Sequence, residues 1–165
     1  MKTKKLLLIL LIVLPVYILI SLYYLDKQYF VYPIDYNKDL IIRSDKWGEG
    51  FFGARRSGGK RQHNGLDLLA EIGTPVLAAR SGIVKDATRS RGMGNYVVLS
   101  HGENITTIYG HLSKIHVNKN ELVRQGQIIG EVGKTGNANH REILPHLHFE
   151  IRVDNSPRDP LNYLE

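Results

Sequence analysis

The sequence of 165 residues predicts one all-β, largely antiparallel domain of β-sandwich-like architecture, preceded by a transmembrane helix near the N-terminus. Beyond residue 47, short apolar runs rich in Val, Ile and Tyr alternate with glycines, which is typical of strands and turns. In that part of the chain, no stretch of helical length has the apolar spacing of a helix. The 16 glycines and only 6 prolines also suit a turn-rich β protein.

The first element is a run of 20 uncharged residues, 6–25, directly after Lys4 and Lys5. About 20 apolar residues span the hydrocarbon core of a bilayer. Lysines before the run and Asp26 after it favour a cytoplasmic N-terminus. A cleaved signal peptide would need small residues in an A-x-A-like pattern at the end of the run, where Ser21-Leu22-Tyr23-Tyr24-Leu25 stand, and a lipoprotein would need a cysteine. We therefore predict that residues 1–25 are an uncleaved, single-pass anchor in the cell membrane, with the rest of the chain extracytoplasmic.

The remaining chain divides into a linker and a domain. Residues 26–46 are mixed and rich in aromatic side chains, and we expect them to form a linker that docks onto the domain of residues 47–165. The apolar runs within this domain predict six strands, at residues 75–79, 82–86, 95–101, 106–109, 127–132 and 146–153.

The formal net charge of +6 is partly a property of the N-terminus. Without Lys2, Lys4 and Lys5, 19 of the 22 basic residues remain against 16 acidic ones, which leaves +3. This weak surplus does not predict a nucleic-acid partner, because such proteins concentrate basic charge in a stripe. One local cluster, Arg55, Arg56, Lys60 and Arg61, is expected to be a solvated basic loop, or alternatively to attract an anionic polymer such as cell wall.

The absence of cysteine leaves only nitrogen and oxygen ligands for a metal ion. Two patterns could supply them: His63 and Asp67 are four residues apart, and His146 and His148 alternate on a predicted strand. Because the period of a strand is two, His146 and His148 share one face. A zinc hydrolase needs three protein ligands, an open position for water and a group that moves protons. Spacing alone allows either His146 or His148 to be the ligand.

Several motifs in order resemble the lysostaphin-type, or LytM-domain, peptidoglycan metallopeptidases. The resemblance extends from about Phe51 to Asn162. The motifs are His63-Asn64-Gly65-Leu66-Asp67, Gly73-Thr74-Pro75-Val76, Tyr109-Gly110-His111-Leu112-Ser113, Gly126-Gln127-Ile128-Ile129-Gly130 and Pro145-His146-Leu147-His148-Phe149-Glu150.

This resemblance implies that His63, Asp67 and His148 bind one zinc ion. It also implies that His111 and His146 lie near the metal without binding it and handle protons during catalysis. The implied activity is zinc-dependent hydrolysis of peptide cross-links in bacterial peptidoglycan, with a metal-activated water as the nucleophile. The stem or bridge peptides of the wall would be the substrate. No motif identifies the scissile bond or a regulatory protein.

Two segments depart from the family pattern. Residues 137–144 are longer and more charged than the small-residue loop expected beside the substrate groove, and they include His140, which is assigned no role. Residues 118–121 replace a glycine-containing turn and are expected to form a surface turn. For His101 and His116 we expect only structural roles.

The sequence is also compared with the requirements of three other functions. A catalytically silent scaffold that activates another wall hydrolase would be missing site residues, whereas all five are present. A lipoyl- or biotinyl-like carrier would need a lysine at an exposed hairpin tip. Lys134 is adjacent to residues 126–130, but the set of histidines and aspartate would then have no explanation. A simple metal buffer would not need His111 and His146 as additional groups.

Overall fold

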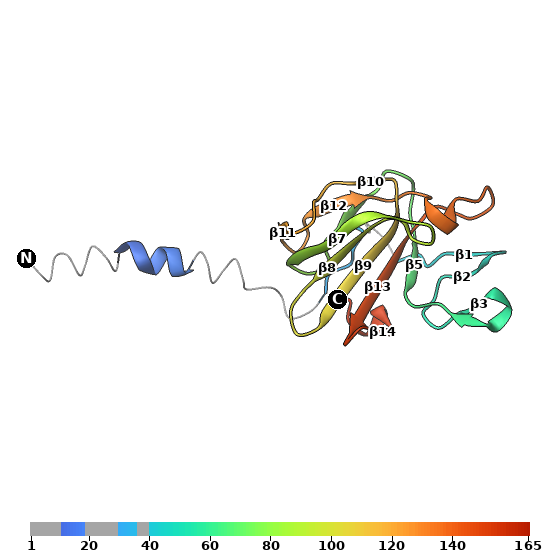
Figure 1. Ribbon diagram of the computed structural model, residues 1–165, viewed down its shortest axis with the longest axis horizontal. Helices are drawn as coiled ribbons and strands as arrows, with labels where there is room; N and C mark the ends of the chain where they lie inside the picture. The colour runs from blue at the N-terminus through green and yellow to red at the C-terminus, as the bar shows by residue number, and fades with distance from the viewer. Residues whose placement is uncertain (1–10, 19–29, 36–39) are drawn as a thin grey trace, which may run out of the picture.

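The computed structural model describes residues 11–18, 30–35 and 40–165 (Figure 1). Residues 11–18 are helical, and no helix among the described residues is both long and apolar enough to cross a membrane. The other residues of the predicted anchor, 1–10 and 19–25, lie outside the described residues, as do positions 26–29 and 36–39 of the predicted linker.

The domain is built on a seven-stranded antiparallel sheet, in which the long strand β13 (His146–Val153) is central to the site. One edge of β13 pairs with β9 (Ile105–Leu112), and the other pairs with β5 (Leu66–Leu69) and then β14 (Ser156–Arg158). Beyond β9 lie β8 (Gly94–Ser100), β7 (Gly82–Ser90) and β11 (Leu122–Val123).

A second sheet of three strands covers part of the large sheet, as the β-sandwich-like prediction requires (Figure 1). Its strands, in order, are β10 (Lys114–Ile115), β12 (Ile128–Glu131) and β6 (Pro75–Leu77). Val76 and Ile129 of this sheet join the same fully buried core as Leu99 and Phe149 of the large sheet. The apolar residues of each strand therefore meet between the sheets, which leaves the opposite face of β13 available for polar side chains.

Two small hairpins and the loop before β13 extend from one end of the large sheet (Figure 1). The first hairpin pairs β1 (Ser44–Asp45) with β2 (Gly48–Glu49), and the second pairs β3 (Arg55–Arg56) with β4 (Arg61–Gln62). Three short 3₁₀ turns complete the described elements, at η1 (Ser57–Gly59), η2 (Gly136–Ala138) and η3 (Pro160–Asn162).

The all-β prediction is confirmed, and all six predicted strands are present. The strand predicted at 146–153 has the predicted bounds, whereas β7 and β9 are longer than the apolar runs that indicated them. Strand β5 was not predicted, because its four residues, three leucines and Asp67, are too few to show the alternation of a strand. The turn at residues 118–121 is confirmed on the surface, with Asn120 at φ 70°, a conformation that asparagine tolerates well in place of glycine.

The described part of the predicted linker docks onto the domain. Phe30 is buried and forms a bridge with Leu164, near the end of the chain. Further along, the backbone N–H of Leu69 donates to the carbonyl of Ile41, and Ile42 forms an antiparallel bridge with Leu68. Residues 41–43 therefore lie beside β5 and approach the functional site directly.

Candidate metal centre and active site

Strand pairing brings Asp67 and His148 together. Asp67 on β5 and His148 on β13 are directly opposite each other in the antiparallel ladder. On its other side, His148 is opposite Gly110 of β9. An added Cβ at Gly110 would lie 3.1 Å from the sulfur of Met93 and 3.4 Å from the Cβ of His148, so a larger residue would crowd the imidazole. The pairing of three strands thus places a carboxylate beside a histidine in a fixed register.

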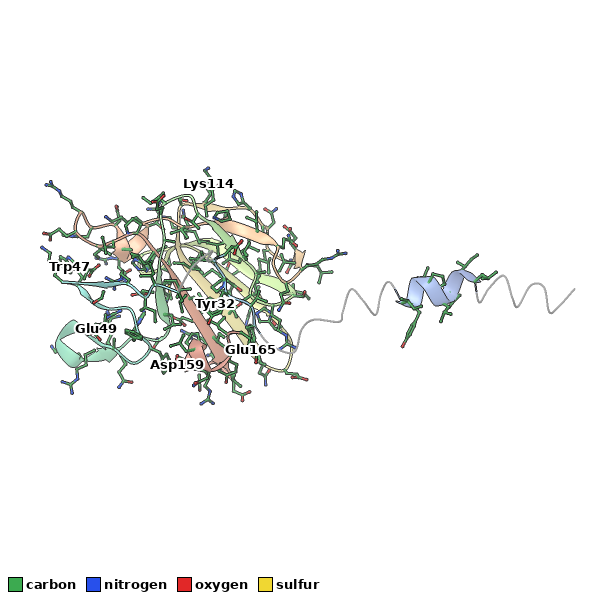
Figure 2. All side chains as sticks on the ribbon, turned by 180° about the vertical axis from the view of Figure 1, so that it is seen from behind. Tyr32, Trp47, Glu49, Lys114, Asp159 and Glu165 are labelled. Atoms are coloured by element: carbon green, nitrogen blue, oxygen red, sulfur yellow. The ribbon has the colours of Figure 1, made fainter. Side chains whose placement is uncertain are left out.

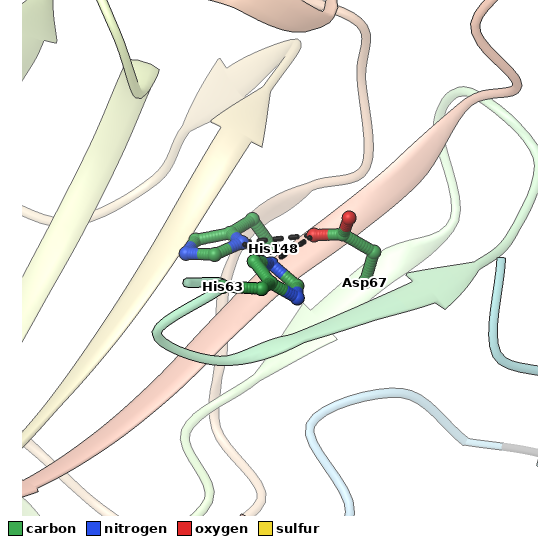
Figure 3. Close-up of side chains that lie close together, drawn as sticks. All are labelled: His63, Asp67 and His148. Atoms are coloured by element: carbon green, nitrogen blue, oxygen red, sulfur yellow. Dashed lines mark hydrogen bonds and ion pairs between the residues drawn. The ribbon is translucent and has the colours of Figure 1, made fainter. Parts of the chain in front are cut away.

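His63 reaches the same point from the loop between β4 and β5. Gly65 permits this approach, because an added Cβ there would lie only 2.2 Å from the carbonyl oxygen of Phe149 on β13. In the resulting geometry, Asp67 Oδ1 lies 3.0 Å from His63 Nε2 and 2.8 Å from His148 Nδ1, and the two ring nitrogens are 3.1 Å apart (Figure 3). All three side chains are buried.

The hydrogen bonds of the second ring nitrogen in His63 and in His148 determine what this group of side chains can bind. His63 Nδ1 lies 2.9 Å from the carbonyl of Phe51, and His148 Nε2 lies 2.9 Å from Glu150 Oε1. Since an N–H must donate to each of these oxygens, the opposite ring nitrogens present lone pairs beside Asp67 Oδ1 whenever the rings are neutral. Three converging acceptors favour a cation, and tetrahedral zinc ligands are separated by about 3.3 Å, close to the observed distances. The residues therefore fit a metal ion.

The second oxygen of Asp67 is fixed by two arginines. Asp67 Oδ2 accepts from Arg43 Nη2 at 2.9 Å and from Arg56 Nη2 at 3.1 Å. Burial opposes ionisation of Asp67, but its hydrogen bonds with His148 and His63 hold the pKa of the carboxyl well below its usual range. Asp67 is therefore an anion with one oxygen facing the histidines.

His111 and His146 lie beside this group. Their ring centroids are 5.0 Å apart, and His146 Nε2 lies 3.8 Å from Asp67 Oδ1. His146 Nδ1 donates to the carbonyl of Leu144 at 2.7 Å, and His111 Nδ1 donates to that of Thr135 at 3.0 Å, so each ring retains Nε2 as an acceptor. His111 has φ 64°, an uncommon backbone conformation that is often found at functional sites.

The surroundings of these histidines shift their pKa values in opposite directions. It lowers the pKa of His111 to about 3, assisted by repulsion from His148 and His146, and it also lowers the pKa of His146. Burial acts the same way on His148, but the Asp67 and Glu150 carboxylates raise its pKa to about 9 in the metal-free protein. His111 and His146 are therefore neutral bases, whereas the ring of His148 carries a proton where a cation would fit.

All five predicted site residues line one cavity of about 400 Å³. Asn137, Ala138 and Ile143 also line it, which confirms that the unusual loop borders the groove. The other histidines lie elsewhere: His101 contacts Thr107 and Phe30, His116 contacts Glu131, and His140 contacts Trp47. Lys134 donates to the carbonyl of Arg141, and it follows β12 rather than occupying a hairpin tip, which removes the basis for a carrier module.

Three further residues belong to the site and were not predicted to do so from the sequence: Glu150, Arg43 and Arg56. Glu150 could have been found, because it follows His148 by two residues and therefore shares its strand face. The interpretation of the basic cluster as a solvated loop is wrong for Arg56, whose guanidinium turns inward to Asp67. Arg43 gave no local signal, since it precedes the motif by twenty residues and meets Asp67 only through tertiary pairing.

Comparison with known proteins identifies the family. Residues 61–160, more than half of the chain, match peptidase family M23. The chain belongs to this family. The matched segment contains all five predicted site residues, whereas Arg43 and Arg56 lie before it.

Relatives of this M23 domain include named wall enzymes. The chain is 45% identical over 95 residues to the peptidoglycan DD-endopeptidase ShyA of Vibrio cholerae, a match that covers 58% of this chain and 21% of ShyA. Its fold matches a zinc containing peptidase from Vibrio cholerae with a TM-score of 0.68 and 37% identity, covering 82% of this chain and 40% of that one.

The antimicrobial peptidase lysostaphin from Staphylococcus simulans matches with a TM-score of 0.60 and 34% identity, over 70% of this chain and 47% of that one. The resemblance to lysostaphin-type peptidases is therefore confirmed. The chain spans only about a fifth to a third of the length of the curated relatives that it matches.

Proposed function

We propose that this chain is a zinc-dependent endopeptidase that hydrolyses peptide cross-links of bacterial peptidoglycan. The observation that carries the proposal is the convergence of His63 Nε2, Asp67 Oδ1 and His148 Nδ1 in a cavity that His111 and His146 also line. The named activity of ShyA and the zinc in the matching Vibrio cholerae peptidase support this assignment.

His63, Asp67 and His148 would hold one zinc ion per chain. When bound, zinc supplies a Lewis acid that activates water and polarises a carbonyl group. Glu150 orients His148 by accepting its Nε2–H, and the Arg152 guanidinium in turn holds Glu150 through Oε2 at 2.7 Å. Carboxylates behind a histidine ligand fix its orientation and raise its basicity.

His111 and His146 would perform the proton transfers. Each ring has its Nδ1–H committed to a backbone carbonyl, so Nε2 can accept a proton from the attacking water. Burial lowers the pKa of both rings and keeps them neutral at neutral pH, and neutrality is required of a base. The same nitrogen can return the proton to the leaving amine, which completes the cleavage of the peptide bond.

The decisive experiment combines purified sacculi of different cross-bridge chemistry with the full chain and identifies new peptide termini by mass spectrometry. The wild type should release new amino and carboxyl termini, and His148→Ala should release none. His116→Ala, which changes an exposed histidine that does not line the cavity, should match the wild type. A wild type that binds zinc and yields no new termini with any sacculus would contradict the proposed activity and favour a non-catalytic scaffold.

A further inference from the structure

The segment that precedes the family match reaches into the site. The backbone N–H of Arg43 donates to the carbonyl of Asp67 at 2.8 Å, and the carbonyl of Arg43 accepts from Gly50 at 2.7 Å. Gly50 also accepts from the N–H of Asp67 at 2.8 Å. Residues 43 and 50, at the two ends of the β1–β2 hairpin, are therefore bonded to the backbone of the candidate ligand itself.

The side chain of Arg43 lies between two carboxylates. Its Nη2 lies 2.9 Å from Asp67 Oδ2, and its Nη1 lies 2.6 Å from Asp45 Oδ2. The Arg43 side chain is 5% exposed and that of Asp45 is 9% exposed. A buried guanidinium needs such partners to offset its desolvation, and its planar fork fixes the direction of each carboxylate. Arg43 thus holds Asp67 in the orientation that turns Oδ1 toward His63 and His148.

Asp45 connects this arrangement to the other side of the cavity. Its Oδ2 also accepts from the backbone N–H of Leu144 at 3.2 Å, and the carbonyl of Leu144 accepts from His146 Nδ1 at 2.7 Å. A continuous chain of polar contacts therefore runs from Asp67 through Arg43, Asp45 and Leu144 to His146. The groups at its two ends are the candidate metal ligand and a candidate base.

The tip of the same hairpin holds the loop before β13. Figure 2 shows Trp47 and Glu49 of this hairpin at one end of the domain. The ring of Trp47 lies 4.5 Å from that of His140, and Lys46 pairs with Glu142. These two contacts hold the longer and more charged loop, residues 137–144, against the hairpin.

We infer that Arg43 and Asp45 are positioning residues for this site, acting on Asp67 and on His146 from outside the family-matched segment. The inference rests on the proposed function for the roles of Asp67 and His146. Arg43 fixes the orientation of the metal-facing oxygen, and Asp45 fixes both Arg43 and the loop that orients His146.

The first test measures zinc affinity of the full chain by competition with a chelating dye. Arg43→Met should weaken zinc binding by about 10–100-fold, the usual effect of removing a partner of a metal ligand. Arg43→Lys keeps the charge without the fork and should restore part of the affinity. Arg55→Met, which removes an exposed arginine from the neighbouring hairpin, should bind zinc like the wild type.

Circular dichroism and the melting temperature of each metal-free variant show whether it is folded. If Arg43→Met does not fold, Arg43→Lys carries the test, and a wild-type affinity in that variant overturns the inference. Zinc affinity within about threefold of the wild type in folded Arg43→Met overturns it as well.

The second test follows the loop. Asp45→Ala should accelerate hydrogen exchange of the Leu144 amide and lower kcat more than it changes KM, because His146 loses its fixed carbonyl partner. Glu49→Gln, on the exposed side of the same hairpin, should change neither quantity. Unchanged exchange at Leu144 in Asp45→Ala would contradict the role of Asp45.

These measurements separate the two hypotheses. Zinc affinity and amide exchange do not require turnover, so they test the positioning roles even if no sacculus is cleaved. Failure of the proposed function would appear as an inactive wild type. Failure of this inference would appear as zinc affinity and Leu144 exchange that the Arg43 and Asp45 variants leave unchanged, whether or not the wild type is active.

Discussion

At the residue scale, a hydrogen bond to one ring nitrogen of each of the four buried histidines determines which nitrogen is left for a metal ion or a proton. His63, His111 and His146 donate through Nδ1 to backbone carbonyls, whereas His148 donates through Nε2 to Glu150. The nitrogen that remains faces the cavity. Position then separates the roles, because only His63 and His148 lie within about 3 Å of Asp67 Oδ1.

Alanine variants should separate ligands from proton-transfer groups. His63→Ala, Asp67→Ala and His148→Ala should lose stoichiometric zinc, since two remaining ligands bind the ion poorly. His111→Ala and His146→Ala should retain zinc while kcat falls by about 10²–10⁴-fold with a modest change in KM. The measurements are metal content by atomic emission and hydrolysis rate, made on the same preparations.

The double variant of His111 and His146 should lose less than the product of the single losses, because both act on one proton path. A zinc-free His146→Ala beside a zinc-loaded His148→Ala would mean that the two roles are exchanged. Wild-type rates in both His111→Ala and His146→Ala would exclude the proton-transfer mechanism.

Zinc binding should also displace a proton from His148. The metal-free pKa of about 9 exceeds the ordinary histidine value near 6.5, so between these pH values the ring is protonated and must lose its proton to become a ligand. Calorimetry at pH 7.5 in buffers of different ionisation enthalpy should detect about one proton released per zinc. His111→Ala should release the same number, because the pKa of His111, near 3, leaves it unprotonated there.

The raised pKa of His148 also determines how the folding stability of the metal-free domain changes with pH. A raised folded-state pKa stabilises the metal-free domain fully below about pH 6.5, and this contribution disappears as pH rises through about 9. Apparent zinc affinity should change in the opposite direction and increase up to about pH 9. Affinity that is constant between pH 6.5 and 9 would contradict the assignment of the proton to His148.

At the element scale, β13 performs two tasks on its two faces. His146, His148 and Glu150 face the cavity, whereas Leu147, Phe149 and Ile151 are completely buried in the core. A shift of one residue in register would exchange these sets, so burial of the apolar face also fixes the position of the ligands. The pairing with β5 then determines which histidine is opposite Asp67.

Substitutions on the two faces should therefore have different effects. Leu147→Ala should reduce the free energy of unfolding by about 2–5 kcal/mol, as large-to-small core changes do, and leave zinc stoichiometry intact below the melting transition. Glu150→Gln should weaken zinc binding by about 10–100-fold through loss of the carboxylate behind His148. Denaturant unfolding and zinc titration measure the two effects, with Ile128→Ala as an exposed control.

At the scale of the whole molecule, the question is how the domain reaches its substrate. We propose that residues 1–25 anchor the chain in the cell membrane and that the domain faces the wall, on the basis of the uncharged run of 20 residues after the N-terminal lysines. The folded part begins close behind that run, since Phe30 is already buried against the domain. The domain would therefore act close to the membrane.

The anchor is tested by fractionating cells and sequencing the N-terminus of the membrane-bound protein. Retention of the first residues, together with resistance to carbonate extraction, is the expected result because an uncleaved span holds the chain in the bilayer. A soluble form that begins near Tyr29 would show that the segment is a cleaved signal. Replacing Leu11 and Val13 by arginine should release the chain from the membrane fraction, because charges at this depth are costly.

Much of the fold and of the candidate site could be predicted from local sequence patterns. The alternation in residues 146–153 predicted a strand with two histidines on one face, and glycine-punctuated apolar runs predicted the sheets. These predictions succeeded because side-chain period and turn chemistry depend on neighbouring residues alone. The five site residues that the motifs indicated also line one cavity.

Only the tertiary structure decided the rest. Which histidine lies opposite Asp67 depends on the register between β5 and β13, and β5 itself, with only four residues, is too short to be recognised from its sequence. Arg43 and Asp45 belong to the site because a preceding segment lies alongside β5 and its hairpin reaches the loop before β13. The physical reason is that a local pattern specifies which face a side chain occupies, whereas contact between distant segments is determined by how the buried faces of the whole domain pack together.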